Sequence, residues 1–400
     1  MSIRVAVLGH GVVGSGVAEI LLHQKDCIFA QRKEELELAY ILDVRSFPDL
    51  PYASLFVQDI NTILQDESVS VVAECIGGAT VAYDLVSACL QAKKSVCTSN
   101  KELIATRGNE LFALAKENGV NLLYEACVGG GIPVLRPIQT CFGANNICKV
   151  SGILNGTTNY ILSRMQETGC KMEEALKEAQ QKGYAEAVPT ADIEGHDAAR
   201  KISILASMAT GKYVSPFDLP VCGIQNVTAE DLKYASVYDC SVKLIAEFEA
   251  ENEGAQLSVG PCLVPNSHLL AHVNGVQNAV RVVGDMVGET VFYGPGAGKN
   301  PTASAVVSDM ITLTNLAPVE RIYWSSEPAK ISEKEKTADY YVRFSGQSGA
   351  KPLSGFENVS FLSDPENQAT CAVVVKNTSR SRLEKALADA NIGLIARVMA

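Results

Sequence analysis

Two lysines are the residues of this 400-residue chain whose positions most suggest chemistry, and the first is Lys201. Asp197 stands four residues before it, so on a helix the two side chains share one face. A solvent-exposed ion pair is the ordinary explanation of this spacing. The segment continues, however, as the strongly apolar stretch Ser203 to Ala206, which admits a second interpretation with the pair facing an internal cleft. A lysine beside a carboxylate in such a cleft can transfer a proton.

The second lysine, Lys101, ends the segment Thr98-Ser99-Asn100-Lys101, which joins a predicted strand to a predicted helix. A lysine in the first turn of a helix is unfavourable because the helix dipole prefers anions there. A residue that breaks a local rule at the carboxyl edge of a parallel sheet is a candidate site residue. The alternative is a solvated surface lysine. No Tyr-x-x-x-Lys pair occurs in the chain and His196 favours a loop or cap role, so a lysine is the proton donor to consider.

A glycine-rich turn directly follows the first apolar run and opens a helix. Its glycines allow a tight turn and a close approach of backbone N–H groups to a pyrophosphate at the helix N-terminus. A turn packed tightly for other reasons is the alternative. We favour dinucleotide binding, with the contacts made by Gly9, Gly11, Val12, Val13 and Gly14.

A side chain at the end of the second predicted strand should contact the adenosine ribose of such a cofactor. An acidic residue there accepts hydrogen bonds from both ribose hydroxyls and favours NAD, whereas an arginine can hold the 2′-phosphate of NADP. Asp43 and Arg45 lie within three residues of each other, so the sequence leaves the choice open.

Two further segments have competing interpretations. Cys75, at the end of the third predicted strand with Gly77 just beyond it, has no histidine near it to activate a thiolate, which favours a buried apolar cysteine over a nucleophile. The glycine-rich run from Glu125 to Pro133 leaves carbonyl groups free to converge on a monovalent cation. Composition alone favours a hinge between domains at this run.

The alternation of elements predicts the fold class. Nearly continuous apolar strands separated by helical patterns are typical of a parallel, doubly wound α/β sheet. The predicted strands are Ile3 to Leu8, Leu36 to Leu42, Val69 to Ile76, Ser95 to Thr98 and Val120 to Tyr124, and the predicted helices are Val12 to Leu22, Thr80 to Gln91 and Lys101 to Glu117. The polar segment Gln24 to Glu35 interrupts the regularity because it is longer than a usual connection.

A mixed α+β region follows from about Arg136. The predicted strands are Lys149 to Leu154, Val221 to Asn226, Ala279 to Val283 and Glu289 to Tyr293, and the predicted helices are Thr157 to Glu167, Lys171 to Gln181 and His196 to Thr210. A helix at Thr302 to Leu316 should pack back on the first domain. Ser332 to Lys336 is typical of a linker, and beyond it we expect strands at Tyr340 to Phe344, Val359 to Leu362, Cys371 to Lys376 and Gly393 to Val398 with a helix at Arg382 to Ala390.

Composition restricts the class of protein further. The 34 basic and 45 acidic residues give a formal net charge of -11, which argues against a nucleic-acid partner. The sequence has no run of 18 apolar residues, and the N-terminal apolar run is shorter than a signal peptide requires. The twelve cysteines lack metal-binding spacing and are typical of reduced core residues. We therefore expect a cytoplasmic protein with no membrane partner.

Six segments, in order and spacing, resemble the motifs of homoserine dehydrogenase over roughly residues 1 to 325. They are GHGVVG, TSNKELIA, EACVGGGIP, GILNGTTNYIL, GYAEAVPTADIEGHDAARK and GPGAGKNPTASAVVSDM. The resemblance implies NAD(P)H-dependent, reversible reduction of L-aspartate 4-semialdehyde to L-homoserine. Such a small zwitterionic substrate explains why acidic and basic groups are grouped together in the sequence.

The resemblance also implies a role for individual residues. Lys201 would donate the proton to the aldehyde oxygen, and Lys101 would hold the carbonyl group or order a water. Glu186 would bind the substrate ammonium group, while Asp192 and Asp197 would orient polar groups. Further contacts are implied for Gly156 and Thr157 with the substrate, and for Gly77, Ser99, Lys101, Gly183 and Gly298 with the cofactor, NADP or NAD. The carbonyl groups of Glu125, Val128, Gly130 and Ile132 would surround a structural sodium ion.

The resemblance completes the expected domain organisation. It implies a Rossmann-type dinucleotide-binding domain at residues 1–135, completed by about 300–325, and a substrate-binding and dimerisation domain at 136–300, so that a homodimer or higher homo-oligomer is expected. Residues 338–400 resemble an ACT-like module, although residues 345 to 358 have the composition of a loop where that pattern has its first helix. Two residues depart from the family pattern: Val188 replaces the usual aspartate and Ser99 a common alanine.

Two other functions are compatible with the same scaffold. One is a cysteine-dependent aldehyde dehydrogenase with Cys75 or Cys127 as the nucleophile. The other is a non-catalytic protein that senses the nicotinamide cofactor. The presence of both Lys101 and Lys201 argues against a sensor, which has no use for them.

Overall fold

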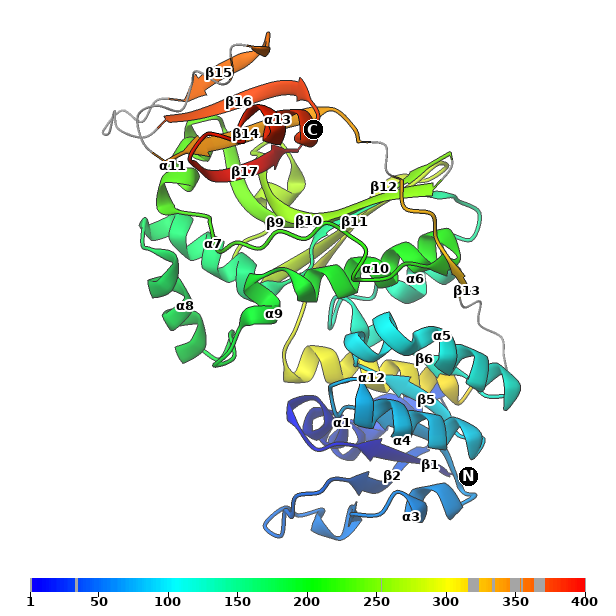
Figure 1. Cartoon of the computed structure of the whole chain (residues 1–400). Coiled ribbons are helices and arrows are strands. Elements are labelled where there is room, and N and C mark those ends of the chain that lie inside the picture. The colour runs from blue at the N-terminus through cyan, green and yellow to red at the C-terminus, as the bar shows by residue number, and fades with distance from the viewer. Residues whose placement is uncertain are drawn as a thin grey trace. The chain divides into compact units, whose positions relative to one another are not determined.

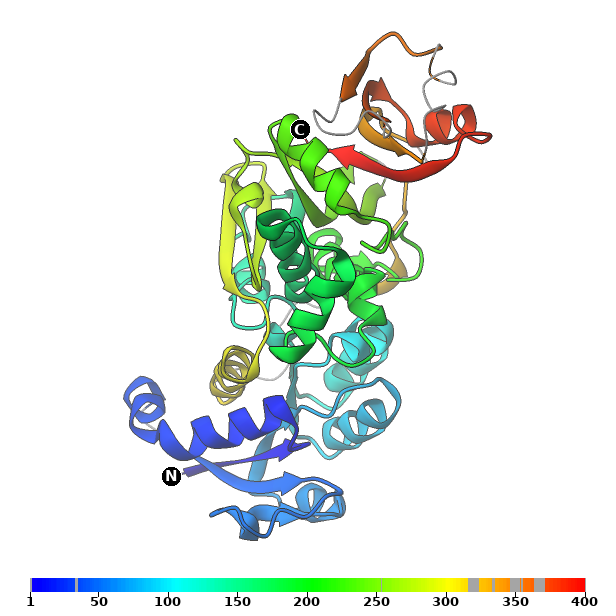
Figure 2. The same cartoon turned by 90° about the vertical axis from the view of Figure 1, so that its left-hand side faces the viewer.

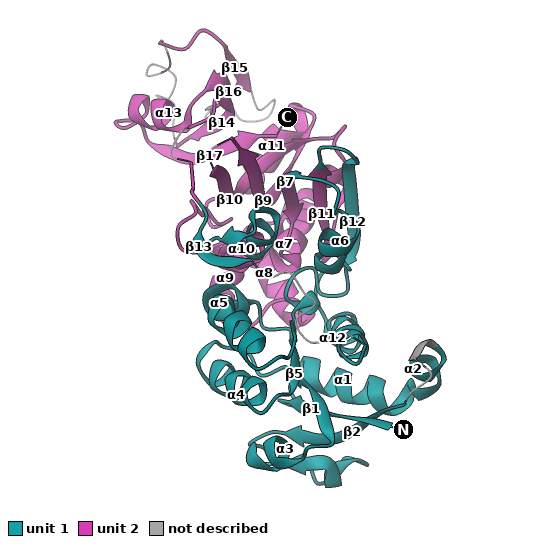
Figure 3. Ribbon diagram, turned by 90° about the vertical axis from the view of Figure 1, so that its right-hand side faces the viewer, with its two compact units in different colours: residues 1–147, 203–216, 284–329 teal, residues 148–202, 217–283, 330–400 magenta. Residues whose placement is uncertain are grey.

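Two compact units make up the computed structural model of the chain, which describes residues 2–32, 35–252, 254–315, 324–332, 335–345, 353, 355–362 and 371–399. Unit 1 comprises Met1–Ile147, Ser203–Pro216 and Gly284–Ala329, and unit 2 comprises Cys148–Ile202, Phe217–Val283 and Lys330–Ala400 (Figure 3). Each unit is therefore built from three separate stretches of sequence.

A parallel sheet forms the centre of unit 1, as predicted. Its strand order is β3-β2-β1-β4-β5-β6, and every neighbouring pair is parallel. The order reverses direction between β1 and β4, which is the point where dinucleotides bind in such sheets. The strands are β1 (Ser2–Leu8), β2 (Glu35–Leu42), β3 (Phe56–Val57), β4 (Val69–Glu74), β5 (Ser95–Thr98) and β6 (Leu122–Leu123).

Helices cover both faces of this sheet. Figures 2 and 3 show α1 (Val12–His23) and α12 (Lys299–Leu313) on one face, with α4 (Thr80–Gln91) and α5 (Lys101–Glu117) on the other. The prediction that the segment near residue 302 packs on the first domain is confirmed by the contact of α12 with α1. A Cβ atom at Gly16 would come within 2.9 Å of the Ala303 Cβ atom, so a glycine is needed where the two helices cross.

The polar segment after α1 contains a helix that the alternation did not predict, α2 (Lys25–Arg32). Its Ile28 is only 5% exposed and joins the core of unit 1. A helix that buries a single apolar side chain shows no clear helical spacing of apolar residues in the sequence. The remaining elements of unit 1 are α3 (Asn61–Gln65), α6 (Leu135–Thr140), β8 (Lys212–Tyr213), β12 (Gly288–Pro295), β13 (Ser325–Pro328) and the short 3-10 helices η1 (Ala53–Leu55) and η2 (Glu125–Cys127).

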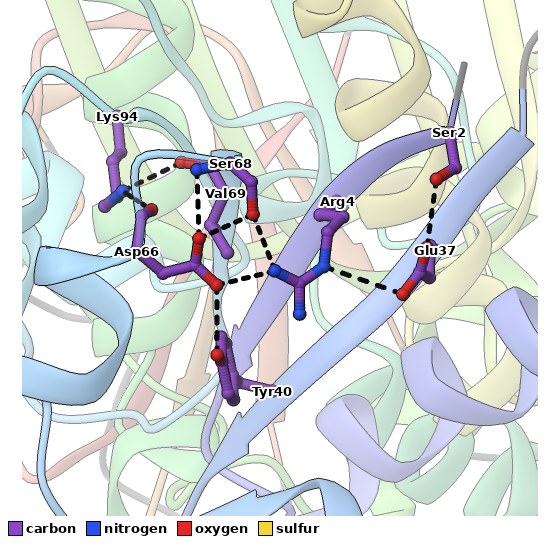
Figure 4. A network of polar contacts seen from close by, with 8 residues as sticks. All are labelled: Ser2, Arg4, Glu37, Tyr40, Asp66, Ser68, Val69 and Lys94. Carbon is purple, nitrogen blue, oxygen red and sulfur yellow. Dashed lines mark hydrogen bonds and ion pairs between the residues drawn. The ribbon is translucent and has the colours of Figure 1, made fainter.

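A polar network holds together the strands of unit 1 near the amino-terminal ends of β1 and β4 (Figure 4). The Asp66 carboxylate accepts hydrogen bonds from Arg4 at 2.6 Å, from Tyr40 at 3.0 Å and from Ser68. These donors, with Ser68 first, hold the pKa of Asp66 below its usual value. The buried Lys94 ammonium donates to the Asp66 carbonyl oxygen at 2.8 Å. The amino-terminal edge of the sheet is thus stabilised by this network. The loops at the opposite, carboxyl edge take no part in it and are where a ligand site can form.

Unit 2 is built on a mostly antiparallel sheet. Its strands follow the order β11-β7-β9-β10-β17-β14-β16-β15. They are β7 (Ile147–Ile153), β9 (Cys240–Glu251), β10 (Gly254–Pro265), β11 (Gln277–Gly284), β14 (Ala338–Phe344), β15 (Val359–Leu362), β16 (Cys371–Thr378) and β17 (Ile392–Val398). Its helices are α7 (Gly156–Thr168), α8 (Met172–Gln181), α9 (Thr190–Ile193), α11 (Ala229–Val237), α13 (Arg380–Ala386), the 3-10 helix η3 (Leu269–His272) and the first half of α10 (His196–Thr210).

The long hairpin of β9 and β10 was not predicted from the sequence. Lys243 and Glu247 are only 2% and 5% exposed in β9, so buried charges disguise the apolar pattern of this strand. Each has a partner: Lys243 donates to the Val273 carbonyl at 2.6 Å, and Glu247 accepts from Arg397 at 2.6 Å. The strand predicted at Val221 to Asn226 is wrong. This segment forms only an isolated bridge to Val259, because its backbone turns away after one residue.

The C-terminal segment continues the sheet of unit 2. The four strands and the helix expected there are confirmed as β14, β15, β16, β17 and α13 (Figure 1). The last strand, β17, pairs in parallel with β10 and in antiparallel with β14, so it lies between them. Of the loop predicted at residues 345 to 358, residues 346–352 and 354 lie outside the described residues, as do 333 and 334 of the predicted linker.

A buried ion pair anchors β14 to the rest of unit 2. The Asp231 carboxylate on α11 is fully buried and accepts hydrogen bonds from Arg343 Nε at 2.8 Å and from the Tyr341 hydroxyl at 2.7 Å. Thr228, the N-cap of α11, donates its backbone N–H and its hydroxyl to the other carboxylate oxygen. The C-terminal segment is therefore held to α11 by charge as well as by strand pairing.

We expect Asp231→Ala to lower the free energy of unfolding by about 3–5 kcal/mol, because it leaves the Arg343 guanidinium buried without its partner. Tyr341→Phe removes one hydrogen bond and should cost only about 0.5–1.5 kcal/mol. Urea denaturation followed by circular dichroism measures both. Glu384→Ala, which breaks an exposed pair with Arg380, is the control with little effect. Equal losses for Asp231→Ala and Glu384→Ala would contradict the anchoring role.

Candidate functional site

The glycine turn between β1 and α1 has the backbone that a dinucleotide-binding loop requires. Gly9 adopts a φ of +90°, a conformation that favours glycine. A Cβ atom at Gly14 would overlap the carbonyl oxygen of Gly9, so this position requires glycine for packing. A Cβ atom at Gly11 would meet no protein atom within 4 Å, although Gly11 is the N-cap of α1. The space beside Gly11 is therefore open where a pyrophosphate would approach the helix N-terminus, with Val12 exposed and Val13 half-buried beside it.

Asp43 and Arg45, which the sequence left as alternatives, form one unit beyond β2. Arg45 Nε and an Arg45 terminal nitrogen donate to the two Asp43 oxygens at 3.0 and 2.9 Å, and Arg45 N donates at 2.9 Å. The backbone N–H of His10, in the glycine turn, donates to Asp43 at 2.7 Å. These hydrogen bonds, those of the Arg45 side chain first, lower the pKa of Asp43. Arg45 also lies over the Phe47 ring at 5.1 Å.

Lys101 is the first residue of α5, at the carboxyl edge of the sheet. Asn100 is the N-cap of this helix, and its side-chain oxygen accepts from the Leu103 N–H at 3.0 Å. Ser99 is half-buried, and the neighbouring loop after β4 contains Gly77 with a φ of +88°. Parallel strands bring these loops to one edge, so unit 1 places the glycine turn, Gly77 and Lys101 along the edge that binds dinucleotides.

The cysteines at this edge are poorly suited to nucleophilic catalysis. Burial is the main cause that raises the pKa of the Cys75, Cys97 and Cys127 thiols above their usual value. The nucleophile in thiol chemistry is the thiolate, which a low-dielectric environment disfavours. A cysteine-dependent dehydrogenase is thus the less suitable interpretation of this edge.

The pair formed by Lys201 and Asp197 is buried, so a surface ion pair is the wrong interpretation of its spacing. Lys201 is 6% exposed and Asp197 is 3% exposed, on the first turns of α10. Lys201 Nζ donates to Asp197 Oδ2 at 2.7 Å and to the Leu154 carbonyl oxygen at 2.6 Å. These two charge-assisted hydrogen bonds fix the orientation of the ammonium group.

Asn155 is a member of this cluster that sequence reasoning missed. Its side-chain nitrogen donates to Asp192 at 2.7 Å and to Asp197 at 2.9 Å. Its side-chain oxygen caps α7 by accepting the Thr158 N–H at 2.8 Å. The available signal was an asparagine directly before a helical pattern, which is typical of an N-cap. One amide therefore joins the start of α7 to both candidate carboxylates.

The remaining substrate candidates lie on α7 and on the loop after α8. Thr157 is in the first turn of α7, after Gly156, and its hydroxyl donates to the Tyr184 carbonyl oxygen at 2.7 Å. Gly183 has a φ of +74° at the end of α8. Glu186 is exposed on the same loop, separate from the buried cluster, and Val188 is 77% exposed. Unit 2 thus brings Asp192, Asp197 and Lys201 together through Asn155, whereas Glu186 faces solvent.

Comparison with known proteins decides the family. Two family models match, one described as homoserine dehydrogenase over residues 133–311 and one as the homoserine dehydrogenase NAD binding domain over residues 9–125. The homoserine dehydrogenase of Neisseria gonorrhoeae is 36% identical over 389 residues, which cover 94% of this chain and 88% of that protein. The chain belongs to the homoserine dehydrogenase family. The resemblance seen in the sequence motifs is confirmed.

Solved structures of homoserine dehydrogenases agree with this assignment. The structure from Thiobacillus denitrificans has a TM-score of 0.90 and 33% identity, covering 100% of this chain and 98% of that chain. A hyperthermophilic archaeal homoserine dehydrogenase in complex with NADPH has a TM-score of 0.67 and 27% identity, covering 80% of this chain and 100% of that one. This member of the family is therefore an oxidoreductase that acts on a CH–OH group and carries a domain for NAD(P).

Two features are absent from the described part of this chain. Among the described residues, none of the helices combines the length and the apolar character needed to cross a bilayer. The described part of the chain also contains no group of three histidine, cysteine, aspartate or glutamate side chains placed to hold a metal ion. Main-chain carbonyl oxygens are another kind of ligand that can hold a cation.

The glycine run after β6 offers such oxygens. Val128, Gly130 and Ile132 are buried, and within the described residues no hydrogen bond that the structure shows is accepted by their carbonyl groups. The chain turns there through Gly129 and Gly130, with φ values of +77° and +54°. The Glu125 side chain has another task, because it accepts the backbone N–H groups of residues 134–136 at the start of α6. Sequence reasoning missed this capping role.

We expect Gly11→Ala to weaken nucleotide binding and Gly14→Ala to destabilise the fold. The methyl group at residue 11 meets no protein atom within 4 Å, so this variant should fold normally. Its affinity for NAD(P)H should fall by about tenfold or more, because the methyl group obstructs the pyrophosphate. The methyl group at residue 14 meets the Gly9 carbonyl and should lower the free energy of unfolding by about 1–3 kcal/mol. Fluorescence titration with NADPH and urea denaturation separate the two effects. Unchanged nucleotide affinity in Gly11→Ala would refute the assignment of this turn.

Proposed function

We propose that this homoserine dehydrogenase reduces L-aspartate 4-semialdehyde to L-homoserine with Lys201 as the proton donor to the substrate oxygen. The observation that carries the proposal is the buried Lys201 ammonium, held by Asp197 and by the Leu154 carbonyl group. When bound, the nicotinamide cofactor supplies the hydride in one direction and accepts it in the other. The protein residues orient the substrate and move the proton.

The proton step depends on the fixed direction of the Lys201 ammonium group. Asp197 Oδ2 and the Leu154 carbonyl accept hydrogen bonds from the ammonium group and so orient it, and the ammonium group supplies the proton to the developing alkoxide. In homoserine oxidation the same nitrogen accepts the hydroxyl proton, by microscopic reversibility. Asn155 prevents Asp197 from rotating because it donates to the same carboxylate oxygen at 2.9 Å. Asp197 and Asn155 thus set the position of Lys201.

The other substrate contacts follow the family pattern. Lys101 holds the aldehyde carbonyl or orders a water, Glu186 binds the substrate ammonium group, and Asp192 orients polar groups beside it. The first turn of α7, with Gly156 and Thr157, presents backbone N–H groups that suit the substrate carboxylate. The exposed position of Glu186 is compatible with a loop that meets a substrate from solvent. Ser99, Gly77, Gly183 and Gly298 are assigned to the cofactor.

The pairing of Asp43 with Arg45 favours NADP over NAD. A carboxylate has about four sites for hydrogen bonds. The two oxygens of Asp43 already accept from the His10 backbone, the Arg45 backbone and two nitrogens of the Arg45 side chain. Asp43 is therefore saturated and cannot also accept from the ribose hydroxyls. The Arg45 side chain is 57% exposed, so its guanidinium remains available to a 2′-phosphate.

A structural sodium ion is part of the proposal. The buried carbonyl oxygens of Val128, Gly130 and Ile132, with that of Glu125, are hard oxygen donors of the kind that such cations prefer. Lack of hydrogen bonds to the carbonyls of Val128, Gly130 and Ile132 among the described residues supports the fit. The ion would stiffen the glycine turn where the chain leaves the sheet of unit 1.

The remaining assignments are a cytoplasmic homodimer or higher homo-oligomer and the three-domain division at residues 1–135, 136–300 and 338–400. Residues 338–400 are proposed as an ACT-like module used for packing or oligomerisation. Its strand order β17-β14-β16-β15 supports this assignment, because a split β-α-β-β-α-β unit orders its strands in the same way. The net charge of -11 argues against a nucleic-acid partner.

We expect Lys201→Ala to lower kcat by about 10²–10⁴-fold, because the proton must then come from solvent. The affinity for NADPH should change little. Absorbance of the nicotinamide during homoserine oxidation gives kcat, and fluorescence titration gives the nucleotide affinity. Lys94→Met is the matched control, since Lys94 is also buried and donates to main-chain carbonyl groups, but at the amino edge of the sheet. Full activity of Lys201→Ala would refute the assignment.

We expect Arg45→Ala to raise KM for NADPH by about 10–100-fold, because a charge-assisted contact to the 2′-phosphate is lost. KM for NADH should stay the same or fall, since Asp43 becomes free to accept from the ribose. Steady-state kinetics with both cofactors at saturating homoserine measure the ratio. A ratio unchanged from wild type would exclude Arg45 as the residue that selects the cofactor.

A further inference from the structure

A buried carboxylate at the carboxyl edge of unit 1 has no part in the reaction described so far. Glu74 is the last residue of β4 and is fully buried. Its Oε1 accepts from the Ile76 N–H at 2.6 Å and from the Gly77 N–H at 3.3 Å, and its Oε2 accepts from the Thr98 hydroxyl at 2.5 Å. Burial of a carboxyl group is costly unless hydrogen bonds compensate for the lost water, and three donors do so here.

The hydrogen bonds to Glu74 favour its charged form. The Thr98 hydroxyl donates to Glu74 and its oxygen accepts the Asn100 N–H at 2.9 Å, so Thr98 links Glu74 to Asn100. The partners Ile76 and Gly77 offer N–H groups as well. An ionised carboxylate has acceptor sites for all three donors. Burial acts in the opposite direction and raises the pKa of Glu74, whereas these hydrogen bonds lower it.

The chain of hydrogen bonds leads from Glu74 to Asn100, the residue before Lys101, and to the loop that contains Gly77 and Gly78. Asn100, which Thr98 holds, caps α5 through its side-chain oxygen, and Lys101 is the next residue. The Asn100 side-chain nitrogen donates to the Gly78 carbonyl at 2.6 Å, and this closes the network on the loop that Glu74 itself holds. One carboxylate thus fixes the two loops that follow β4 and β5.

We propose that Glu74 is a positioning residue of the dehydrogenase, which through Thr98 and Asn100 aligns the start of α5 with the loop at Gly77. The proposal rests on the proposed roles of Lys101 and Gly77. β4 lies beside β1 at the reversal of strand order, so its terminal loop adjoins the dinucleotide position. Reactions of this kind lose about 10²-fold in rate for a misplacement near 1 Å, so a residue remote from the chemistry can control it.

The test compares Thr98→Val with Thr98→Ser. Valine keeps the size of threonine but leaves Glu74 and the Asn100 N–H without their shared partner, whereas serine keeps the hydroxyl. We expect Thr98→Val to lower kcat for homoserine oxidation by about 10–100-fold, with KM for homoserine within about threefold of wild type. The deuterium isotope effect on hydride transfer should rise, because that step becomes more rate-limiting. Thr98→Ser should restore the activity.

Glu74→Gln and Asn100→Asp extend the test. Glutamine removes the charge and one acceptor, and aspartate keeps the helix cap while losing the donor to Gly78. Both should weaken NADPH binding by about fivefold or more in a fluorescence titration, because the Gly77 loop is no longer held. Asp66→Asn is the matched control. It disturbs the network at the opposite edge of the same sheet (Figure 4) and should lower thermal stability while leaving kcat and nucleotide affinity within twofold.

Three results overturn the proposal. They are equal kcat values in Thr98→Val and Thr98→Ser, an isotope effect that does not change in Thr98→Val, and wild-type nucleotide affinity in Asn100→Asp. If Thr98→Val does not fold, Asn100→Asp decides, since aspartate is as good a helix cap as asparagine. The nucleotide titrations do not depend on the proton donor. If Lys201 is not the proton donor, the titrations still test the role of Glu74. If the titrations show wild-type affinity, the role of Glu74 is refuted and the assignment of Lys201 is unaffected.

Discussion

A charge that is removed from water must find a partner inside the protein, and this constraint explains much of the structure. The Lys201 ammonium is held by Asp197 and a carbonyl group, and the Arg343 guanidinium by Asp231. The same rule applies to Glu247, which lies buried between Lys149 and Arg397. The contacts of Lys201 with Leu154, of Arg343 with Asp231 and of Arg397 with Glu247 join segments that are 47 or more residues apart, so these buried charges help to fix which segments lie together.

The two polar networks of unit 1 stabilise opposite edges of the same sheet. Asp66 and its donors hold the strands near their amino-terminal ends, where no ligand is expected. Glu74 holds the loops at the carboxyl edge, where parallel sheets bind cofactors. The first network maintains the scaffold and the second sets the geometry of the site. A sheet of this class needs both, because its loops are only as rigid as the strands that end in them.

Sequence reasoning found the parts of the fold that have local signals. Apolar runs separated by helical periods predicted the parallel sheet of unit 1, and the i,i+4 spacing with an apolar continuation indicated that Lys201 and Asp197 could be buried. The β9–β10 hairpin was missed because Lys243 and Glu247 interrupt its apolar pattern, although both are buried. Their partners are 30 or more residues away, and no local pattern reveals them.

Partners that are distant in the sequence also hid part of the site from sequence reasoning. The glycine turn and the two lysines could be predicted as site residues because their motifs are contiguous. The position of Asn155 in the cluster was missed because its carboxylate partners lie 37 and 42 residues further along the chain. Glu74 is similar, since its hydroxyl donor is 24 residues away. A residue that acts by holding others gives no signal until the chain is folded, whereas a residue that binds a ligand through a loop motif does.

The place of β17 has a consequence for how the protein is made. This strand is formed by residues 392–398 of a 400-residue chain, yet it lies between β10 and β14 in the sheet of unit 2. A ribosome that has synthesised β10 must still produce more than a hundred residues before the neighbour of that strand emerges. Until β17 has emerged, this edge of β10 stays unpaired and open to strands of other nascent chains. The sheet can therefore close only after residues 392–398 have been synthesised, and loss of this segment removes an interior strand of the sheet.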